Sequence, residues 1–330
     1  MRLASLWYES HPISLLLLPI SGLFRAVVAL RRIAYKSGVL HRQKLPIPVI
    51  VVGNITVGGT GKTPLVIWLA EMLRDMGHQP GIVSRGYRGD TTSWPQIVEA
   101  ESDPAKVGDE PVLIALRTGC PVAVAPQRVK AARLLISDKG CDVIVCDDGL
   151  QHYALERDLE IVVLDGERRL GNGHCLPAGP LRETAARLHG VDLVVVNGEA
   201  SSNECRMHLV GTKVQSLSDP HVFQDLSEWQ GTTVHGVAGI GNPGRFFAHL
   251  RAHGLNVLEH PFPDHHRFEE KDLRFSDTLP VLMTEKDAVK CRRFASPRHW
   301  YVPVNAGIEG DCKIRFHNLI MNLFPRDNAN

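Results

Sequence analysis

The residues with the clearest chemical potential form a glycine-rich stretch, residues 53–63 (GNITVGGTGKT). An apolar, β-branched run at residues 49–52 precedes it, and a helical pattern starts at Lys62. Glycines let backbone N–H groups close around a phosphate chain, and the start of a helix adds partial positive charge. A lysine and a threonine at the end of such a loop can reach the β/γ-phosphates and ligate Mg²⁺. We therefore predict a nucleotide-phosphate site formed by Thr56, Val57, Gly58, Gly59, Thr60, Gly61, Lys62 and Thr63.

Two adjacent acids, Asp147 and Asp148, follow a second apolar run at residues 142–146 (DVIVC). Ligand groups gather at the carboxyl ends of strands in a parallel sheet, and a nucleotide-binding enzyme of this kind places there the acid that holds Mg²⁺. A turn or a helix cap is the alternative role for the pair. Because the chain also carries the glycine-rich stretch, we predict a Mg²⁺ site at these acids.

Two further clusters of titratable groups are GDEP at residues 108–111 and PDHHR at residues 263–267. Asp109 and Glu110 precede a proline that can open a helix, so N-capping would explain them without catalysis. His265 and His266, beside Asp264, suit acid/base work or metal binding. Histidines in loops are also often only solvated, so spacing alone leaves both clusters open.

Two other classes of function fit parts of this pattern. The first is a GTPase or metallochaperone in which His265 and His266 bind a metal ion. GTPases of this class recognise guanine with N-K-x-D, and the nearest segment here, residues 284–287 (TEKD), has the wrong order. The second is a membrane-surface protein that uses the nucleotide only as a switch. Turnover of ATP compared with GTP tests the first alternative, and phosphate incorporation into a lipid tests the second.

Residues 239–244 (GIGNPG) match G-x-G-x-x-G after a strand, with Glu259 about twenty residues later, which is the fingerprint of a dinucleotide site. Only one short α/β unit follows, and the phosphate site is already assigned. We therefore favour a helix start, with Asn242 as N-cap and Pro243 as the first helical residue.

Length and composition set outer limits on the function. At 330 residues the chain is long enough for two domains. A net charge of +1 argues against a general nucleic-acid-binding protein. The seven cysteines contain no C-x-x-C pair, which predicts reduced thiols and neither a disulfide framework nor a zinc site. We expect no obligate protein partner.

The N-terminal segment carries its own charge pattern. Residues 1–44 contain seven Lys or Arg and one acid, set around the apolar run at residues 13–24 (ISLLLLPISGLF). That run is shorter than the roughly 20 residues of a spanning helix and contains Pro19 and Gly22. We predict an interfacial helix on anionic lipid, with a buried packing helix as the alternative.

From residue 48 onwards, apolar strands alternate with helical patterns, which predicts an α/β fold with a parallel sheet sandwiched by helices. The expected class is P-loop NTPase-like, with a second, smaller α/β domain. Polar, turn-rich sequence near residues 201–231 suggests the boundary. We predict an N-terminal membrane-associated helix at 1–40, a kinase-like domain at 41–230 and a smaller domain at 231–330, whose last strand and helix can return to the first domain.

The motifs together resemble the tetraacyldisaccharide 4′-kinase family of lipid A biosynthesis. The resemblance is carried, in order, by the basic apolar N-terminus, GNITVGGTGKTP (53–64), SRGYRG (84–89), GDEP (108–111), DDGLQH (147–152), LPAGPLRE (176–183), GIGNPGRFF (239–247), FPDHH (262–266) and TEKDAVK (284–290). Thr56 stands where the general loop pattern has glycine, and it fits this family's own loop.

The resemblance implies a lipid kinase that uses ATP and Mg²⁺. Such an enzyme transfers the γ-phosphate to the 4′-hydroxyl of tetraacyldisaccharide 1-phosphate, giving the bis-phosphorylated lipid A precursor (lipid IVA). It implies two α/β domains with the active site between them, at the cytoplasmic face of the bacterial inner membrane. On this interpretation Asp109 is the base and His265 its partner. The expected Mg²⁺ ligands are Thr63, Glu110, Asp147 and Asp148, and the expected substrate or supporting residues are His152, Arg182, Glu183 and Asp264.

Overall fold

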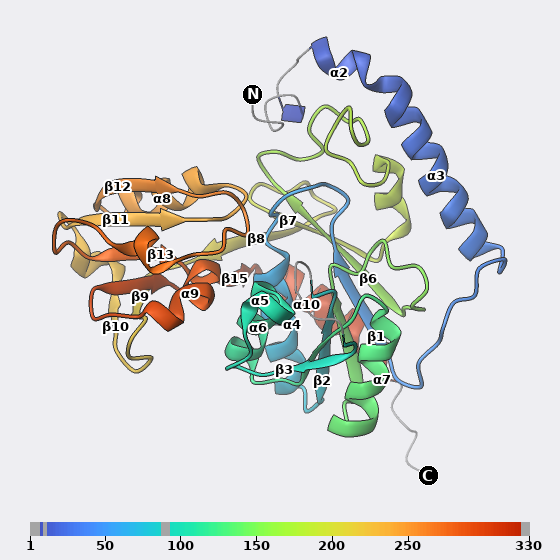
Figure 1. Ribbon diagram of the computed structural model, residues 1–330. Helices are drawn as coiled ribbons and strands as arrows, with labels where there is room; N and C mark the ends of the chain where they lie inside the picture. Colours follow the sequence, from blue (N-terminus) through green and yellow to red (C-terminus); the bar gives the residue numbers. More distant parts are fainter. Residues whose placement is uncertain (1–6, 9–11, 87–92, 325–330) are drawn as a thin grey trace.

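The computed structural model describes residues 7–8, 12–86 and 93–324. It has two lobes, and a nine-stranded sheet forms the centre of the larger one (Figure 1). Seven strands are parallel, and the two edge strands, β15 and β3, run antiparallel to their neighbours. Across the sheet the strands lie in the order β15 (Asn305–Ile308), β8 (Cys205–Val210), β7 (Leu193–Asn197), β6 (Leu159–Asp165), β1 (Val49–Gly53), β5 (Val143–Asp147), β2 (Pro80–Ser84), β4 (Val122–Val124) and β3 (Gln96–Val98). The predicted α/β class with a mostly parallel sheet is confirmed.

Apolar cores cover both faces of this sheet, because its central strands carry apolar side chains on both faces over most of their length. Alternate residues of β1 enter different cores: Ile50 and Val52 on one face, Val49 and Val51 on the other. Helices α4 (Lys62–Asp75), α6 (Asp109–Thr118) and α10 (Gly310–Met321) supply the first core. Helix α7 (Arg128–Lys139) supplies the second. The short α5 (Pro104–Val107) and the 3₁₀ helix η1 (Ala185–Gly190) complete the lobe.

A six-stranded sheet forms the second lobe. Its order is β10 (Phe223–Asp225), β9 (Lys213–Ser216), β14 (His299–Val302), β13 (Val281–Thr284), β11 (Thr233–Ala238) and β12 (Asn256–Pro261). The last four strands are parallel, and β9 and β10 are antiparallel additions. Its helices are α8 (Pro243–Ala252), α9 (Glu285–Cys291) and the 3₁₀ helices η2 (Leu226–Trp229), η3 (Glu270–Leu273) and η4 (Arg292–Phe294).

The segment 201–231 differs from its prediction as a polar boundary region. It contains β8, which belongs to the first sheet, and β9 and β10, which belong to the second, so a boundary at residue 230 divides the second sheet. In β8 the buried Cys205 and Met207 alternate with the exposed Arg206 and His208. Such alternation lowers the average hydropathy of a strand, which is why composition alone missed it.

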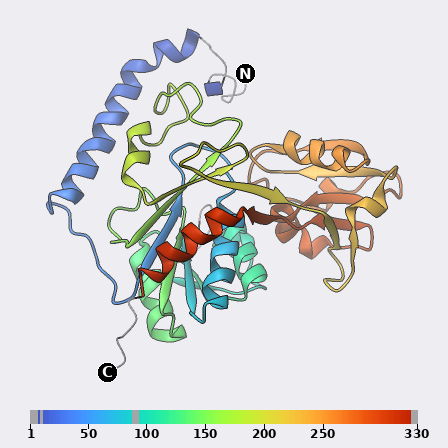
Figure 2. The ribbon, with the colours of Figure 1, turned by 180° about the vertical axis from the view of Figure 1, so that it is seen from behind.

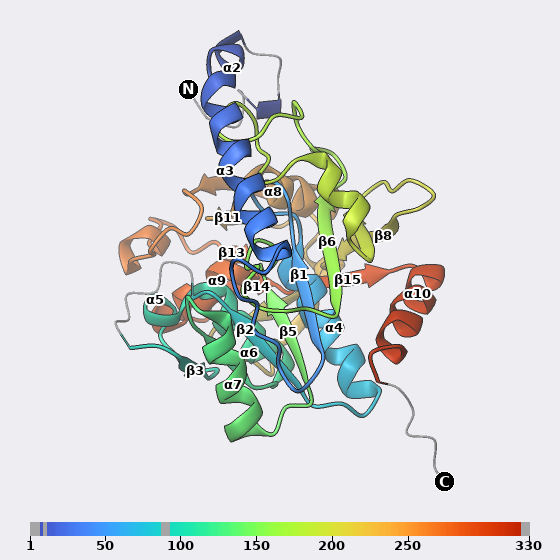
Figure 3. The same ribbon diagram turned by 90° about the vertical axis from the view of Figure 1, so that its right-hand side faces the viewer.

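A long N-terminal helix lies on the side of the first lobe that faces away from the second (Figures 1 and 3). It consists of α2 (Pro12–Leu16) and α3 (Leu18–Lys36). Ser21 anchors it by donating a hydrogen bond to the carbonyl oxygen of Cys175 at 2.8 Å, and Phe24 packs against the second core. No helix in the described ranges is both long and apolar enough to cross a membrane.

The chain returns to the first lobe at its C-terminal end. Strand β15 pairs with β8, and α10 then lies beside α4 on the face seen in Figure 2. Phe316 of α10 is fully buried and meets Trp68 of α4 edge to face, with 4.9 Å between ring centroids. The last helix is therefore part of the first lobe's core.

We expect Phe316→Ala to lower the free energy of unfolding by about 3–5 kcal/mol, because it removes a fully buried ring and leaves a cavity. Thermal unfolding followed by circular dichroism measures the change. Ile314→Ala, on the exposed side of the same helix, is the control and should cost less than about 0.5 kcal/mol. Equal effects would mean that α10 does not complete this core.

Candidate active site at the cleft between the lobes

The glycine-rich loop runs from the end of β1 to the start of α4. Gly58 and Gly61 adopt positive φ angles of 109° and 95°, which glycine tolerates best. The loop is held from outside by a backbone hydrogen bond from Val57 to the carbonyl of Pro180, at 2.8 Å. Thr56 is buried and forms a β-bridge with Leu181. Gly61 caps α4, so the predicted loop does end at a helix N-terminus.

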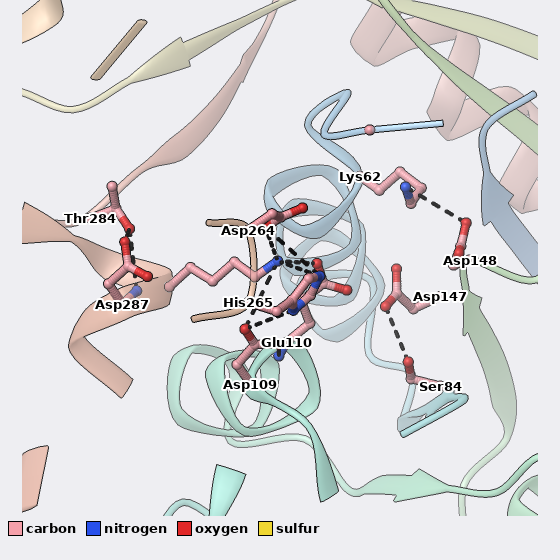
Figure 4. Close-up of polar contacts among 12 residues, drawn as sticks. Lys62, Ser84, Asp109, Glu110, Asp147, Asp148, Asp264, His265, Thr284 and Asp287 are labelled. Carbon is pink, nitrogen blue, oxygen red and sulfur yellow. Dashed lines mark hydrogen bonds and ion pairs between the residues drawn. The ribbon is translucent and has the colours of Figure 1, made fainter. Parts of the chain in front are cut away.

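Lys62 is the first residue of α4 and points toward Asp148 (Figure 4). Its Nζ lies 3.6 Å from Asp148 Oδ1, and Arg182 donates to both oxygens of the same carboxylate at 3.1 and 3.2 Å. Burial disfavours the ionised carboxylate, but the charges of Lys62 and Arg182 outweigh it and lower the pKa of Asp148 to about 2. Asp148 is therefore a permanent anion at this edge of the sheet.

Asp147 is the last residue of β5, and its environment has the opposite effect. Its side chain is buried; Oδ2 accepts a hydrogen bond from Ser84 at 3.3 Å, and Oδ1 has no partner among the described residues. Burial and the charges of Glu110 and Asp148 raise the pKa of Asp147 to about 7. A buried carboxylate oxygen without a donor is a group that a cation would stabilise.

The second lobe completes the site from across the cleft. His265 Nδ1 lies 3.1 Å from Asp109 Oδ2, and Lys286 Nζ lies 2.8 Å from Glu110 Oε1. Asp109 and Glu110 open α6 of the first lobe, whereas His265 and Lys286 belong to the second. Figure 4 shows Asp109, Glu110 and His265 beside the group formed by Lys62, Ser84, Asp147 and Asp148. A cavity of about 840 Å³ is lined by residues of both lobes, Asp109 and His265 among them.

The structure does not support the alternative in which Asp109 of the GDEP motif only caps the following helix. Gly108 occupies the N-cap position, and Asp109 is the first helical residue. Burial disfavours the Asp109 anion, but the hydrogen bond from His265 and the charges of Lys286 and Lys290 outweigh it and hold its pKa far below its usual range. Asp109 therefore enters any reaction as a carboxylate.

The remaining predicted residues lie in different places. Arg182 is in the site, and Asp264 borders it, with Oδ1 3.8 Å from Lys286 Nζ. His152 is partly buried, and burial with nearby arginines lowers its pKa to about 4, so it is neutral at pH 7. Thr63 follows Lys62 in α4 and is partly exposed.

Glu183 is linked to the glycine-rich loop through Gln151. Its buried carboxylate accepts hydrogen bonds from Tyr153 and, at 2.9 Å, from Gln151 Nε2. The same Gln151 nitrogen donates to the carbonyl of Asn54 at 3.0 Å, next to the start of the loop. Glu183 thus supports the start of the loop through Gln151.

The metal-binding alternative for His265 and His266 is not favoured. His265 faces Asp109, whereas His266 Nε2 lies 2.9 Å from Asp272, so the two rings do not converge. Within the described part of the chain, no three His, Cys, Asp or Glu side chains form a group able to hold a metal ion by themselves. Mg²⁺ in kinases is normally held by one or two carboxylates together with substrate phosphates, which Asp147 fits.

Sequence reasoning missed several residues of the site. Ser84 and Lys286 received no role, although Ser84 is the last residue of the parallel strand β2 and Lys286 lies two residues after the end of β13. The rule that ligand groups gather at such ends could have found both. Residues 87–89 of the SRGYRG motif lie outside the described residues. Helix α8 does start at Pro243, but the side chain of Asn242 makes no capping hydrogen bond.

Known proteins match this chain over most of its length. The model of one family, described as tetraacyldisaccharide-1-P 4′-kinase, matches residues 13–321. A tetraacyldisaccharide 4′-kinase of Nitrosococcus oceani is 54% identical over 302 residues, which are 92% of this chain and 89% of that protein. One of Alkalilimnicola ehrlichii is 54% identical over 94% and 93% of the two chains. The crystal structure of LpxK from Aquifex aeolicus in complex with ATP superposes with a TM-score of 0.81 and 29% identity, over 94% and 99%.

The raised pKa of Asp147 predicts a pH-dependent stability of the metal-free protein. The folded state binds the Asp147 proton more tightly than the unfolded state, so this contribution is complete below about pH 4 and is lost as the pH rises to about 7. Asp147→Asn should therefore stabilise the protein by about 1–4 kcal/mol at pH 8 and have little effect at pH 4. Urea unfolding in EDTA at both values measures this.

Asp148→Asn is the matched control with the opposite expected sign. Its carboxylate is stabilised by Lys62 and Arg182, so the variant should be less stable at pH 8. A loss of stability in both variants at pH 8 would contradict the assignment of Asp147 as the unfavourably buried acid.

Proposed function

The chain belongs to the tetraacyldisaccharide-1-P 4′-kinase family, and we propose that it transfers the γ-phosphate of ATP to the 4′-hydroxyl of tetraacyldisaccharide 1-phosphate. The product is the bis-phosphorylated lipid A precursor. The observation that carries the proposal is the position of the Asp109–His265 pair beside Lys62 of the glycine-rich loop and the Asp147–Asp148 pair (Figure 4). A phosphoryl acceptor needs a base, and a donor needs a cradle of N–H groups and charge, within one site.

The donor half of the reaction is assigned to the first lobe. The backbone N–H groups of residues 58–61 and the Lys62 ammonium bind the phosphates of ATP. Thr63, Asp147 and Asp148 supply the oxygens expected for Mg²⁺, with Glu110 as a further predicted ligand. When bound, Mg²⁺ neutralises the charge that builds up on the phosphate oxygens. Arg182 keeps Asp148 paired at 3.1–3.2 Å while Lys62 engages the phosphates.

The acceptor half is assigned to the Asp109–His265 pair. The hydroxyl oxygen forms a bond to the γ-phosphorus while the bond from that phosphorus to the bridging oxygen of ADP breaks. The hydroxyl proton passes to the carboxylate of Asp109. Asp109 is held for this by its own helix on one side, where Oδ1 accepts from the N–H of Glu110 at 2.9 Å, and by His265 on the other.

Purified protein with Mg-ATP should add one phosphate to tetraacyldisaccharide 1-phosphate, measured with γ-labelled ATP and located by mass spectrometry. Lys62→Ala should reduce kcat about a hundredfold to a thousandfold, because it removes a charge that stabilises the transferring phosphate. Asp109→Ala should reduce kcat about a hundredfold to ten-thousandfold with little change in KM for ATP. Lys271→Ala, an exposed lysine of the second lobe, is the control and should keep full activity. ATP hydrolysis without any labelled lipid would refute the kinase assignment.

We also propose that α3 rests on the anionic lipid at the cytoplasmic face of the inner membrane, where the acceptor resides. Four apolar side chains on one face of this helix are 56–68% exposed: Ile20, Leu23, Val27 and Leu30. Their spacing of three and four residues forms a stripe along the helix. Arg25, Arg31, Arg32 and Lys36 on the same helix can meet lipid phosphates.

Leu23→Ser combined with Leu30→Ser should weaken flotation with phosphatidylglycerol/phosphatidylethanolamine vesicles several-fold, because it removes apolar area that enters the interface. The melting temperature should change little, since both side chains are exposed. Ile314→Ser, equally exposed on α10, is the control and should float as the unmodified protein does. Unchanged flotation of the double variant would place the lipid contact elsewhere.

A further inference from the structure

Lys286 connects groups of both lobes at the centre of the cleft. Its Nζ lies 2.8 Å from Glu110 Oε1 and 4.0 Å from Asp109 Oδ2 on the first lobe. On the second lobe it lies 3.4 Å from His265 Nε2 and 3.8 Å from Asp264 Oδ1. The side chain is only 18% exposed. Lys286 is thus one cation that touches both members of the Asp109–His265 pair.

The chemistry of these contacts restricts where the imidazole proton can be. A lysine ammonium has three donors and no acceptor, and an ionised carboxylate has only acceptors. His265 Nε2 faces the ammonium and must accept, whereas Nδ1, 3.1 Å from the Asp109 carboxylate, must donate. Asp264 Oδ1 lies 3.8 Å from the same Nε2, beyond hydrogen-bond distance. Both contacts are satisfied by one neutral tautomer.

We infer that Lys286 is a positioning residue that fixes His265 as the Nδ1–H tautomer, so that this N–H orients the Asp109 carboxylate toward the acceptor hydroxyl. The inference rests on the proposed kinase function and adds a residue to it. Oδ1 of Asp109 is held by the Glu110 N–H and Oδ2 by His265, which leaves the carboxylate plane no freedom to rotate. Without the ammonium, the imidazole can turn or change its tautomer, and Oδ2 loses its donor.

The short helix α9 positions both Lys286 and His265. Asp287, the residue after Lys286, is fully buried and accepts a hydrogen bond from the N–H of Gly239 at 2.8 Å. Gly239 in turn accepts from the N–H of His265 at 3.3 Å. His265 adopts a φ angle of 59°, an uncommon conformation for a residue with a side chain, and one that is held only where surrounding contacts impose it. Helix α9 therefore fixes the geometry of the lysine–histidine contact.

A second ion pair across the same helices provides a matched control. Arg117 of α6 donates to both carboxylate oxygens of Glu285 on α9, at 2.7 and 2.9 Å, without touching Asp109 or His265. If Lys286 served only to tie the lobes together, loss of either cation would have the same effect. If it orients His265, only the effect of the Lys286 substitution on kcat should depend on whether the imidazole is present.

We expect Lys286→Met to lower kcat for lipid phosphorylation about tenfold to a hundredfold, the usual effect of removing a residue that orients a functional one, with little change in KM for ATP. Lys286→Arg, which keeps a donor, should recover part of the loss. In a His265→Ala background the same Lys286→Met change should cost little more, because the group it positions is gone. Arg117→Met should keep a higher kcat than Lys286→Met, and its effect should be the same in both backgrounds.

Nitrogen-15 NMR of the full protein labelled at histidine reads the tautomer without any need for activity. The signals of His265, assigned by their absence in His265→Ala, should show Nδ1 protonated and Nε2 unprotonated in the unmodified protein. In Lys286→Met the same signals should shift. In Lys286→Arg they should keep the positions that they have in the unmodified protein.

An Nε2–H tautomer in the unmodified protein would overturn the inference, as would equal costs of Lys286→Met in the presence and absence of His265. Kinetics of Arg117→Met that match those of Lys286→Met in every background would reduce Lys286 to a tether. Complete absence of lipid phosphorylation by the unmodified protein would instead contradict the proposed function, and the tautomer measurement would still stand.

Discussion

A buried carboxylate at the contact between two lobes cannot remain ionised unless donors reach it, and Asp109 receives most of its donors from the second lobe. His265, Lys286 and Lys290 all approach its Oδ2, at 3.1, 4.0 and 3.8 Å. Two opposite unit charges 4 Å apart near a protein surface attract each other by about 4 kcal/mol. This interaction makes the ionisation of Asp109 and the docking of the lobes depend on each other, because separating α6 from α9 would remove His265, Lys286 and Lys290 from the Asp109 carboxylate.

The two sheets contribute to the cleft by the same rule of parallel topology. In the first, β1 leads into the glycine-rich loop, β2 ends at Ser84 and β5 ends at Asp147. In the second, β11 leads to the Gly239 loop and β13 leads to Lys286. A Cβ atom on Gly241 would lie 3.4 Å from the backbone nitrogen of Gly59, so the second lobe comes close to the glycine-rich loop itself. Carboxyl ends of strands in both lobes therefore surround one volume, and neither lobe holds a complete site.

The sequence was sufficient wherever a local pattern decides the structure. The apolar runs that lead to Lys62 and to Asp147 predicted the main strands to within a few residues, and the acids after them are found at the expected edge. It was insufficient where contacts join distant residues. The hydrogen bond from His265 to Asp109 spans 156 positions, and the contact of Lys286 with Glu110 spans 176. No local spacing predicts such pairs, and none distinguishes a substrate role for Glu183 from the supporting role that it has through Gln151. For the same reason β8, β9 and β10, which are short and at most half buried, lie in a segment whose composition indicated only a polar domain boundary.

Asp147 and Asp148 are adjacent in the chain, but their carboxylates lie in different environments. Asp148 has a positive φ of 47°, so its side chain leaves the strand direction and reaches Lys62 and Arg182, while Asp147 stays in the strand and is buried beside Ser84. Lys62 and Arg182 already compensate the negative charge of Asp148, whereas the charge of Asp147 is not compensated in this way. We therefore expect a cation that binds together with a nucleotide to be stabilised most by Asp147, because it would also offset the cost of burying that carboxylate. Lys62, at 3.6 Å, is the looser partner of Asp148, so it can turn to a phosphate while Arg182 keeps the acid paired.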